Sequence, residues 1–511
     1  MSQSRTKLGL INSSISSIYM VVQLLLGFYS RKIFINYLGD EILGLNTTAV
    51  NILQFINLAE LGIGTAVGFS LYRPIRQKHH DTICEIIALQ GFLYRRIAIF
   101  MIIGALAVMA FFPIIFKKIS LPLWYAYASF GVMLFSSLLS YFFTYRQVLL
   151  SSSQKDYAIQ LSYRTWIIIK IVFQMLAVAK LPNPYVWWLI LEVIFAIIAT
   201  ISLHRHIKHT FPYLRPVTKS FHQLKKNHSV IFTKIKQLIF HRIAGFALFQ
   251  ASPLIIYAYL SLSVVTIYGN YLIIVNGIRS ACDAVFGSTA AGVGDLIAEN
   301  NTSKILTVFE EMFSIRFFFA TIASVCFTIL TPPFIQLWIG RSYILPAITV
   351  LIIAGVLFIN IYRNALDIFI NAFGLFKDIW SPIAEALINI TISIAFGYLW
   401  GLPGILSGSL ISLIIIIGIW KPYFLYTCGL KQPPLKYLTL FLRYTLLATA
   451  AILFTTTLYR FIPIDPAASW TQFLIASTLF VILLSVILST TLYFTTKGFR
   501  LFINRLINLT K

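Results

Sequence analysis

The sequence predicts an all-α polytopic membrane protein with about fourteen transmembrane helices. Of its 511 residues, 59% are apolar and only 11% are charged, and the mean hydropathy is +0.84. A soluble domain is about 25% charged, so this composition excludes a soluble enzyme, a disordered chain and a disulfide-stapled secreted domain. The four cysteines are scattered and show neither a disulfide framework nor a metal-ligand spacing, so we predict no metal site.

Apolar runs of about 20 residues, the length that crosses the hydrocarbon core, recur along the whole chain. The first run contains Asn12 and several serines and is followed by no small-residue cleavage site, so we interpret it as a retained span rather than a signal peptide. The predicted spans lie near residues 10–30, 45–70, 92–116, 122–146, 157–179, 185–203, 235–260, 265–291, 305–331, 345–372, 379–400, 403–424, 437–459 and 470–495.

Basic residues are distributed unevenly between the two sides of the membrane when the N-terminus is placed inside. Segments predicted to lie inside carry 24 Lys and Arg, segments predicted to lie outside carry 7, and nine lie within spans. Because cytoplasmic loops carry an excess of Lys and Arg, this asymmetry predicts that both termini are cytoplasmic and that the number of spans is even.

The longest hydrophilic stretch separates two groups of six spans that carry similar short motifs. Asn51 and Asn276 are 225 positions apart, and Glu60 and Asp283 are 223 positions apart. Six is even, so matching spans run in the same direction; this predicts a parallel repeat about an axis along the membrane normal, with substrate between the halves near the midplane. The predicted domains are an N-terminal six-helix lobe (1–203), a basic cytoplasmic linker (204–234), a C-terminal six-helix lobe (235–428) and two additional transmembrane helices (429–511).

The stretch between the two groups contains a segment, residues 218–240, in which lysines alternate with apolar residues at roughly helical spacing. One interpretation is a connector that lies on the anionic inner leaflet. The other is a solvated basic loop that simply follows the topology rule for cytoplasmic segments.

Charged residues within the spans are the main candidates for function. Nine basic and five acidic residues give the membrane interior a net charge of +4. A charge at the bilayer centre costs about 2.5–3.5 kcal/mol on insertion scales, so these residues face a bundle interior or a wet cavity. Internal pairing is one interpretation, because Arg279/Asp283 and Arg363/Asp367 are spaced four residues apart. The other is a cationic cavity that binds an anionic cargo such as a pyrophosphate. The candidate substrate-binding residues from this count are Arg164, Lys170, Arg279, Arg316 and Arg363.

Two intramembrane carboxylates, Glu60 and Asp283, occupy equivalent depths in the two halves and are each followed by glycines. Gly64 and Gly68 follow Glu60, and Gly287 follows Asp283. Glycines at these positions permit either close helix packing or a hinge between inward and outward states. Glu60 and Asp283 are therefore candidates for ion coupling, by H+ or Na+, or for gating.

The loops leave no room for the active site of an enzyme. The longest outside loop, residues 460–469, has ten residues, and the chain contains neither a phosphate-binding G-x-x-x-x-G-K-[ST] motif nor an H-E-x-x-H motif. A membrane glycosyltransferase or polymerase is disfavoured for the same reason. We predict a passive or ion-coupled carrier, or a channel, with no cofactor and no nucleic-acid partner, and not an enzyme.

Several motifs spread over about 400 residues resemble one transporter family. They are SRKIFINYLGDEILGLNTTAVNILQFINLAELGIGTAVGFSLYRPI (30–75), YRQVLLSSSQKDY (145–157), NAFGLFKD (371–378), EALINITISI (385–394) and GLPGILSG (401–408). The chain thereby resembles the polysaccharide (O-antigen, capsule or exopolysaccharide) flippases, the Wzx-like branch of the multidrug/oligosaccharidyl-lipid/polysaccharide exporter (MOP) superfamily. The resemblance adds Arg31, the basic residue that ends the first span, to the substrate-binding candidates, and it draws attention to Glu60.

The resemblance implies a MATE-like arrangement of two six-helix bundles forming a V around a central cavity, plus two C-terminal helices. It implies a bacterial cytoplasmic (inner) membrane protein that flips undecaprenyl-pyrophosphate-linked oligosaccharide by alternating access. The implied partners are the lipid-linked oligosaccharide, membrane lipids, and a polysaccharide polymerase with chain-length machinery. The alternatives are a lipid II flippase and a MATE-like multidrug antiporter; the net positive interior argues against an exporter of cationic drugs.

Overall fold

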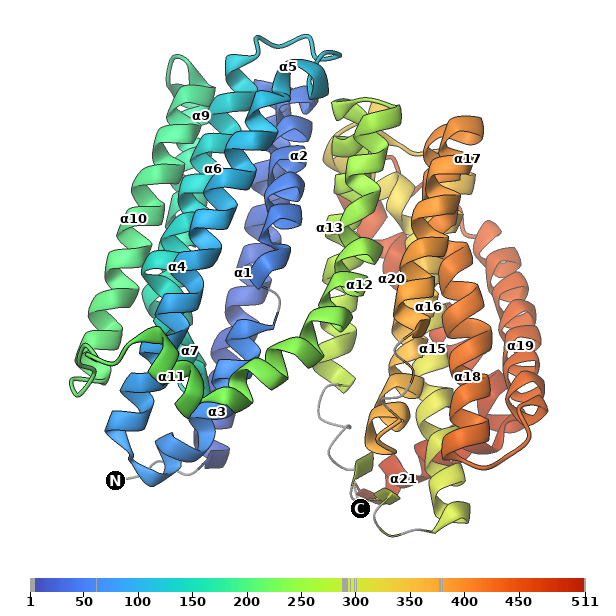
Figure 1. The fold of residues 1–511 in the computed structure, drawn as a ribbon. Coiled ribbons are helices and arrows are strands. Elements are labelled where there is room, and N and C mark those ends of the chain that lie inside the picture. Colours follow the sequence, from blue (N-terminus) through green and yellow to red (C-terminus); the bar gives the residue numbers. More distant parts are fainter. Residues whose placement is uncertain are drawn as a thin grey trace. The chain divides into compact units, whose positions relative to one another are not determined.

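The computed structural model describes residues 5–509 except 61, 287–292, 295, 298, 300, 376, 377 and 379; of residues 5–10, 58, 59, 236–250, 506 and 509 it describes the backbone alone. Every regular element in the described residues is helical, which confirms the predicted all-α fold class (Figure 1). By its internal contacts the chain divides into two units, Met1–Thr266 and Ile267–Lys511.

The first unit is a bundle of long helices that run side by side (Figure 1). Helix α10 packs against α9 and α6, α6 packs against α2 and α4, and α1 packs against α9. The last helix of the unit, α12, packs against α2 and α3. The helices are α1 (Arg5–Leu38), α2 (Asp40–Ile56), α3 (Ile63–Gln77), α4 (His80–Ala110), α5 (Phe112–Ile115), α6 (Trp124–Phe142), α7 (Gln147–Ser152), α8 (Asp156–Ile159), α9 (Thr165–Lys180), α10 (Pro184–Thr210), α11 (Phe221–Asn227) and α12 (Ser229–Tyr259).

The second unit is built around α15, which packs against α16, α20 and α21; α16 packs in turn against α17, and α19 packs against α20. The helices are α13 (Leu262–Phe286), which begins in the first unit, α15 (Thr302–Trp338), α16 (Ala347–Ala372), α17 (Trp380–Leu413), α18 (Lys421–Phe424), α19 (Leu435–Arg460), α20 (Trp470–Thr495) and α21 (Lys497–Leu509).

Where their residues are described, the fourteen predicted spans fall largely on helical segments; residues 61, 287–291 and 379 of these spans lie outside the described residues. Eleven helices in the described residues are long and apolar enough to cross a membrane. The two numbers differ partly because the run Trp380–Gly429 counts as one helix although two spans were predicted there. Between α2 and α3, the tight turn η1 (Asn57–Glu60) and Gly62 break the predicted second span into two helices. The protein is a multi-pass membrane protein.

Gly401 marks the boundary between the two spans that the sequence places at 379–400 and 403–424. Its backbone is non-helical, with φ of 61° and ψ of −133°. The two arms pack closely: Ser393 Oγ donates a hydrogen bond to the carbonyl of Ile405 over 2.7 Å. A Cβ on Gly404 would collide with the carbonyl oxygen of Phe396, and a Cβ on Gly408 would collide with Ser393 Oγ. Glycine at these two positions therefore allows the arms to approach.

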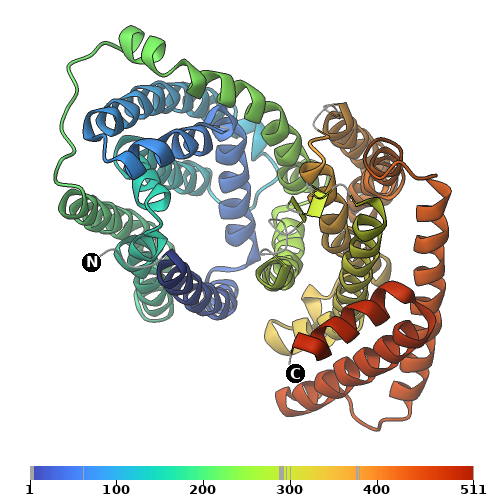
Figure 2. The same ribbon diagram turned by 90° about the horizontal axis from the view of Figure 1, so that it is seen from below.

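The connector after α10 runs along the outer edge of the first unit to α11 (Figure 2). Ser220 begins α11 with a capping box, in which its side chain accepts from the Gln223 N–H and the Gln223 side chain accepts from the Ser220 N–H. The predicted helical spacing of 218–240 is confirmed, since α11 and α12 cover most of this segment. The boundaries between the four predicted domains remain predictions.

Candidate functional site

The first unit contains a cavity of about 790 Å³ between α3, α4, α7 and the chain around η3 (Gln160–Arg164). We call it the Glu60 cavity. It brings together Glu60 and Arg164, which the sequence singled out separately, and adds the carboxylate of Asp156. The cavity lies entirely within residues 60–164, and so inside one unit.

Glu60 is positioned by the break between α2 and α3. Helix α2 ends at Ile56, the turn η1 carries Glu60, and Gly62 adopts a left-handed backbone with φ of 90° before α3 begins. A residue with a Cβ pays about 1–2 kcal/mol in this conformation, so glycine suits the position. The break exposes the Glu60 side chain to the cavity instead of burying it along a continuous helix.

Two buried tyrosines hold the Glu60 carboxylate. Tyr94 Oη of α4 donates to Glu60 Oε1 over 2.7 Å, and Tyr141 Oη of α6 lies 2.8 Å from Glu60 Oε2. Tyr141 Oη also approaches Asn57 Oδ1. An ionised carboxylate can only accept hydrogen bonds, while a protonated one gains a single O–H donor and keeps its other oxygen as an acceptor. Adding one proton would therefore change the contact on one side, to Tyr94 of α4 or to Tyr141 of α6.

The opposite wall of the cavity is a short π-helical turn, η3, which precedes α9. π-helical turns are rare and often occur at functional sites. This turn carries Gln160 and Arg164 into the cavity wall, where Arg164 Nη1 donates to Gln23 Oε1 of α1 over 3.3 Å. Arg164 is exposed, so its remaining N–H groups are accessible.

Much of the lining consists of neutral polar and aromatic side chains. Two of its amide oxygens, Gln90 Oε1 and Gln160 Oε1, are buried and make no hydrogen bond to the described residues. A buried acceptor without a partner costs about 1–3 kcal/mol. The other polar and aromatic lining residues are Thr65, Phe69, Tyr72, Ser140, Tyr145, Gln147, Ser151 and Ser152.

Lys170 lies outside this cavity and forms an ion pair. Its Nζ is 2.6 Å from Glu192 Oε1 of α10, and each side chain is 16% exposed. Gln174 Nε2 donates to the second oxygen, Glu192 Oε2, over 3.1 Å. Lys170 thus joins α9 to α10 through a neutral pair.

We expect Lys170→Met to lower the thermal stability of the protein, because it leaves Glu192 half-buried with only an amide partner; the expected cost is about 1–3 kcal/mol. The double variant Lys170→Met/Glu192→Gln should recover most of the loss. The unfolding midpoint of the detergent-solubilised protein, followed by intrinsic fluorescence, measures both. Equal midpoints for the single and double variants would show that the pair does not hold α9 to α10.

Arg363 belongs to a charge network in the second unit. Its Nε is 3.1 Å from Asp367 Oδ2 and its Nη1 is 3.7 Å from Glu385 Oε1. Lys421 Nζ lies 2.5 Å from Asp367 Oδ1, so two cations face two carboxylates. The ion pair that the four-residue spacing of Arg363 and Asp367 predicts is present within α16. The contacts to Glu385 and Lys421 tie α16 to α17 and to the start of α18.

Arg316 is almost fully buried in α15, with 1% of its surface exposed. Its Nε donates to Asn364 Oδ1 over 3.1 Å, its Nη1 donates to the Met312 carbonyl, and its guanidinium lies 4.8 Å from the centre of the Phe286 ring. These contacts are those of a packed side chain between α13, α15 and α16.

The remaining candidates lie on α1 and α13. Arg31 Nη2 donates to the carbonyl of Thr266 over 2.9 Å. Arg279 is half-buried, and Asp283, one turn further along α13, is exposed. Gly287 lies outside the described residues. Gly64 and Gly68 pack against Tyr94 and against Ser152 and Val148, at distances of 3.3–3.5 Å from an added Cβ.

The whole chain resembles known proteins in its fold but not in its sequence. No protein-family profile matches the sequence, and no curated protein matches it. Solved structures do match. A lipid II flippase, MurJ, in an inward closed conformation aligns with a TM-score of 0.62 and 15% identity over 93% of this chain and 98% of its own. An inward-facing multidrug resistance MATE family transporter of the MOP superfamily aligns with a TM-score of 0.56 and 11% identity over 80% and 95%. The fold is MATE-like.

A third structure with this MATE-like fold is a MOP superfamily transporter from Pyrococcus furiosus, described as having a binding pocket of reverse polarity. It aligns with a TM-score of 0.51 and 15% identity over 84% of this chain and 97% of its own. The MATE-like architecture that the resemblance implied is thus shown by the fold, while the polysaccharide-flippase branch is not distinguished from other transporters with the same fold.

The six cationic candidates separate into different environments within this MATE-like fold. Arg164 lines the Glu60 cavity, Lys170 and Arg363 pair with carboxylates, and Arg316 is packed in the interior. The charged groups of the Glu60 cavity are two carboxylates and one guanidinium, so this cavity is mixed in charge and not the cationic one that the interior count predicts. The predicted roles of the six cations in substrate binding remain predictions.

Two features of the Glu60 cavity were not predicted from the sequence. Tyr94 and Tyr141 carry no motif, because their proximity to Glu60 depends on three helices meeting. The π-helical turn at η3 also has no sequence signature that periodicity could reveal. The amide-rich pattern of Gln147 and Gln160 around the YRQVLLSSSQKDY motif is the signal that could have drawn attention to this wall.

Proposed function

We propose that the protein is a flippase that moves undecaprenyl-pyrophosphate-linked oligosaccharide repeat units to the outer leaflet of the bacterial cytoplasmic membrane by alternating access, for surface polysaccharide assembly. The observation that carries the proposal is the fold shared with a lipid II flippase over 93% of the chain. The MATE family transporter aligns over a smaller share, 80%. Both termini are placed in the cytoplasm, and a polymerase with chain-length machinery is the expected downstream partner.

The Glu60 cavity supports an oligosaccharide as the polar cargo. Sugar hydroxyls donate and accept hydrogen bonds, and the lining contains glutamine side chains together with serine and tyrosine hydroxyls. Arg164 is the accessible guanidinium in the lining and can form charge-assisted hydrogen bonds to a phosphate group. A polar path of this kind is what the head group requires, because neither sugars nor pyrophosphate enter hydrocarbon unaided.

Glu60 is the proposed coupling group, with H+ the ion that fits its contacts. Protonation would give one of its two oxygens an O–H group, and would so change one of the contacts to the Tyr94 and Tyr141 hydroxyls from accepting to donating. Because these tyrosines belong to α4 and α6, the proton would change contacts across the bundle. Asp283, on α13, is the corresponding candidate for gating in the second unit.

A MATE-like multidrug antiporter is the second candidate, and one observation favours it. The Glu60 cavity holds two carboxylates, Glu60 and Asp156, against one guanidinium, a balance that suits a cationic drug. A lipid II flippase is the third candidate, on the strength of the shared fold alone.

Transport in proteoliposomes separates these candidates. The full-length protein is reconstituted with a fluorescent undecaprenyl-pyrophosphate oligosaccharide, with fluorescent lipid II, or with ethidium inside the vesicles, each with and without a proton gradient. We expect the labelled oligosaccharide to reach the outer leaflet, where an added quencher removes its fluorescence. We expect little movement of ethidium. Movement of ethidium alone would replace the proposal by the antiporter, and movement of lipid II alone would replace it by the lipid II flippase.

A further inference from the structure

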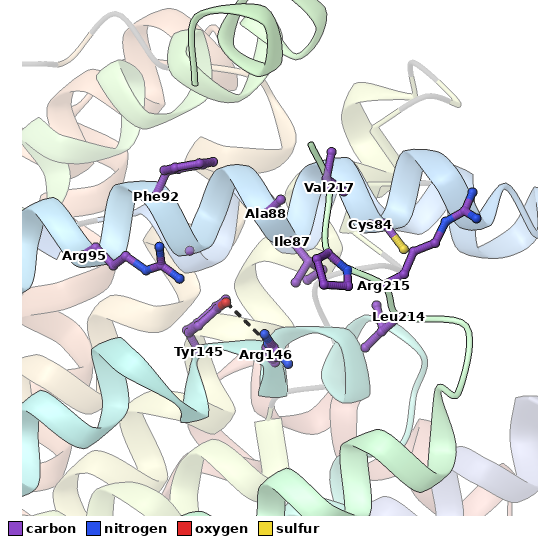
Figure 3. A pocket seen from close by; sticks show the side chains of 12 residues that line it. Cys84, Ile87, Ala88, Phe92, Arg95, Tyr145, Arg146, Leu214, Arg215 and Val217 are labelled. Carbon is purple, nitrogen blue, oxygen red and sulfur yellow. Dashed lines mark hydrogen bonds between the residues drawn. The ribbon is translucent and has the colours of Figure 1, made fainter. Parts of the chain in front are cut away.

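A second cavity, of about 360 Å³, lies beside the Glu60 cavity in the first unit (Figure 3). It is enclosed by α4, by the turn η2 (Thr144–Arg146) and by residues 214–217 of the connector. We call it the arginine pocket, because its lining includes Arg95 of α4, Arg146 of η2 and Arg215 of the connector (Figure 3). Much of the remaining lining is apolar, formed by Ile87, Phe92 and Val217 among others.

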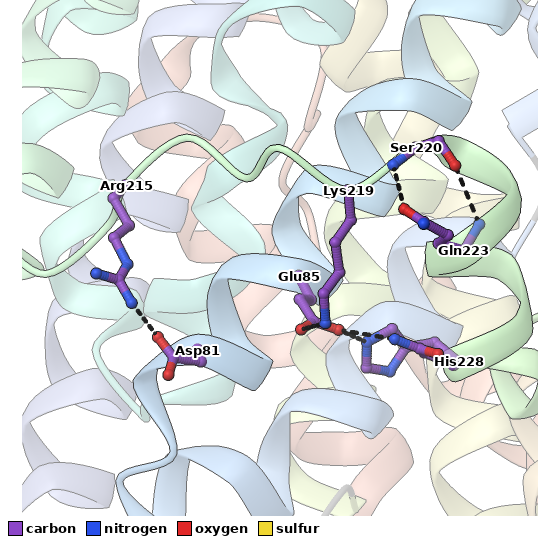
Figure 4. A network of polar contacts seen from close by, with 8 residues as sticks. Asp81, Glu85, Arg215, Lys219, Ser220, Gln223 and His228 are labelled. Atoms are coloured by element: carbon purple, nitrogen blue, oxygen red, sulfur yellow. Dashed lines mark hydrogen bonds and ion pairs between the residues drawn. The ribbon is translucent and has the colours of Figure 1, made fainter.

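The acids of α4 are occupied elsewhere (Figure 4). Asp81 Oδ1 lies 2.6 Å from Arg215 Nη2, and Glu85 lies 2.6 Å from Lys219 Nζ. His228 Nε2 is 3.0 Å from the second Glu85 oxygen. These contacts fasten the connector to α4 and give Arg215 of the pocket lining a carboxylate partner. They leave neither Asp81 nor Glu85 as a partner for Arg95 or Arg146, and α4 contains no other acid.

Arg95 and Arg146 therefore carry positive charge that the described residues do not neutralise. In the described part of the chain, no carboxylate oxygen forms an ion pair with either guanidinium at a distance of 4 Å or less. Arg146 Nε donates to Tyr145 Oη over 3.3 Å, which orients its guanidinium and leaves its terminal N–H groups for another acceptor. The neighbouring Arg96 is distinct, because its guanidinium lies 3.9 Å from the centre of the Phe221 ring.

The placement of Tyr145 is enforced by its contact with α4. A Cβ on Gly91 would lie 2.7 Å from Tyr145 Oη and 3.2 Å from Cζ, so only glycine allows the ring to sit there. Gln90 Nε2 also donates to the Tyr145 carbonyl over 3.4 Å. The pocket is thus a built feature of α4 and η2, whose lining combines Arg95 and Arg146, 51 positions apart in the sequence, with apolar side chains.

We propose that the arginine pocket binds a phosphate group, carried either by an anionic membrane lipid or free in solution. Guanidinium groups form strong, often bidentate, hydrogen bonds to phosphate oxygens. The apolar wall would accommodate the carbon portion of a phosphate ester. The topology predicted from the basic residues places this pocket on the cytoplasmic side, where the leaflet is anionic. The proposal does not depend on which cargo the protein moves.

Binding to the full-length protein in a non-ionic detergent tests the proposal with two probes. In one arm, sodium pyrophosphate is titrated calorimetrically; in the other, mixed micelles with phosphatidylglycerol or with phosphatidylcholine are compared by thermal shift. We expect the stabilisation by phosphatidylglycerol, or the pyrophosphate affinity, to fall at least about tenfold in Arg95→Gln/Arg146→Gln. The control Arg76→Gln/Arg205→Gln removes the same charge from two exposed arginines of the same unit and should bind as the wild type does.

Each outcome either identifies the ligand of the arginine pocket or overturns the proposal. A response to phosphatidylglycerol alone identifies a lipid head group as the ligand, and a response to pyrophosphate as well identifies phosphate itself. No response to either probe in the wild type, or an equal loss in the control variant, overturns the proposal. Arg95→Gln alone covers the case in which the double variant fails to fold, because Arg95 is exposed; it should still weaken binding at least threefold, and unchanged binding would also overturn the proposal.

Discussion

Replacing Glu60 with glutamine is expected to abolish the stimulation of transport by a proton gradient. Glutamine keeps the shape of the side chain but cannot take up a proton, so the two tyrosine contacts would no longer change with protonation. Hydrogen bonds to a charged group contribute about 1.5–3 kcal/mol. If this contribution no longer differs between the protonated and the ionised protein, the transport rate should change at least about tenfold. Initial rates in proteoliposomes, at equal and at unequal pH across the membrane, measure the effect.

The matched control for Glu60→Gln is Asp156→Asn, because Asp156 is the other carboxylate of the Glu60 cavity and accepts from Ser151 Oγ over 2.6 Å. It should retain the stimulation by a proton gradient. Tyr94→Phe removes one donor to Glu60 and should give an intermediate response. A Glu60→Gln protein that still responds fully to the gradient would remove Glu60 from the coupling role and leave Na+, or no ion, as the alternative.

Replacing Arg363 with methionine is expected to cause the largest loss of stability among the intramembrane charges. Glu385 is 2% exposed, and its Oε1 atom has no hydrogen-bond partner, so Arg363 at 3.7 Å is its main compensation. Removing one partner of a buried ion pair costs about 3–5 kcal/mol, because the other charge stays buried. The unfolding midpoint in detergent should fall strongly.

The double variant Arg363→Met/Glu385→Gln tests the physical reason for this loss. It removes both members of the pair, and Lys421 remains at 2.5 Å from Asp367, so the unfolding midpoint should recover by more than half. A double variant as unstable as Arg363→Met would show that the loss comes from packing around the guanidinium instead of from an uncompensated carboxylate.

The fold was predictable from the sequence because its signal is local. About 20 consecutive, mostly apolar residues are enough to predict each span. The break at Gly401 was placed correctly between two predicted spans, and the ion pair between Arg363 and Asp367 follows from helical spacing alone. The break between α2 and α3 was not predicted, because a single polar residue, a carboxylate and a glycine within a long apolar run are also compatible with a continuous span.

The candidate site was predictable in part. The sequence selected Glu60 and Arg164 as separate candidates, but their presence in one cavity depends on how α3, α4 and η3 meet. The expected excess of cations fails as a guide to this cavity, because charge counted over a whole chain ignores distance. Lys170 and Lys421 form ion pairs with carboxylates on neighbouring helices, and no rule of sequence spacing predicts these partners.

The beginning of α13 has a mechanical consequence for the whole molecule. Thr266 Oγ1 donates to the Asp40 carbonyl, Arg31 donates to the Thr266 carbonyl, and Gly44 leaves room for the backbone of Leu262. The polypeptide crosses from one unit to the other once, immediately after this anchored turn and inside a continuous helix. Because the first turn of α13 is anchored in the first unit, any motion of one unit relative to the other has to bend or twist α13 beyond Thr266.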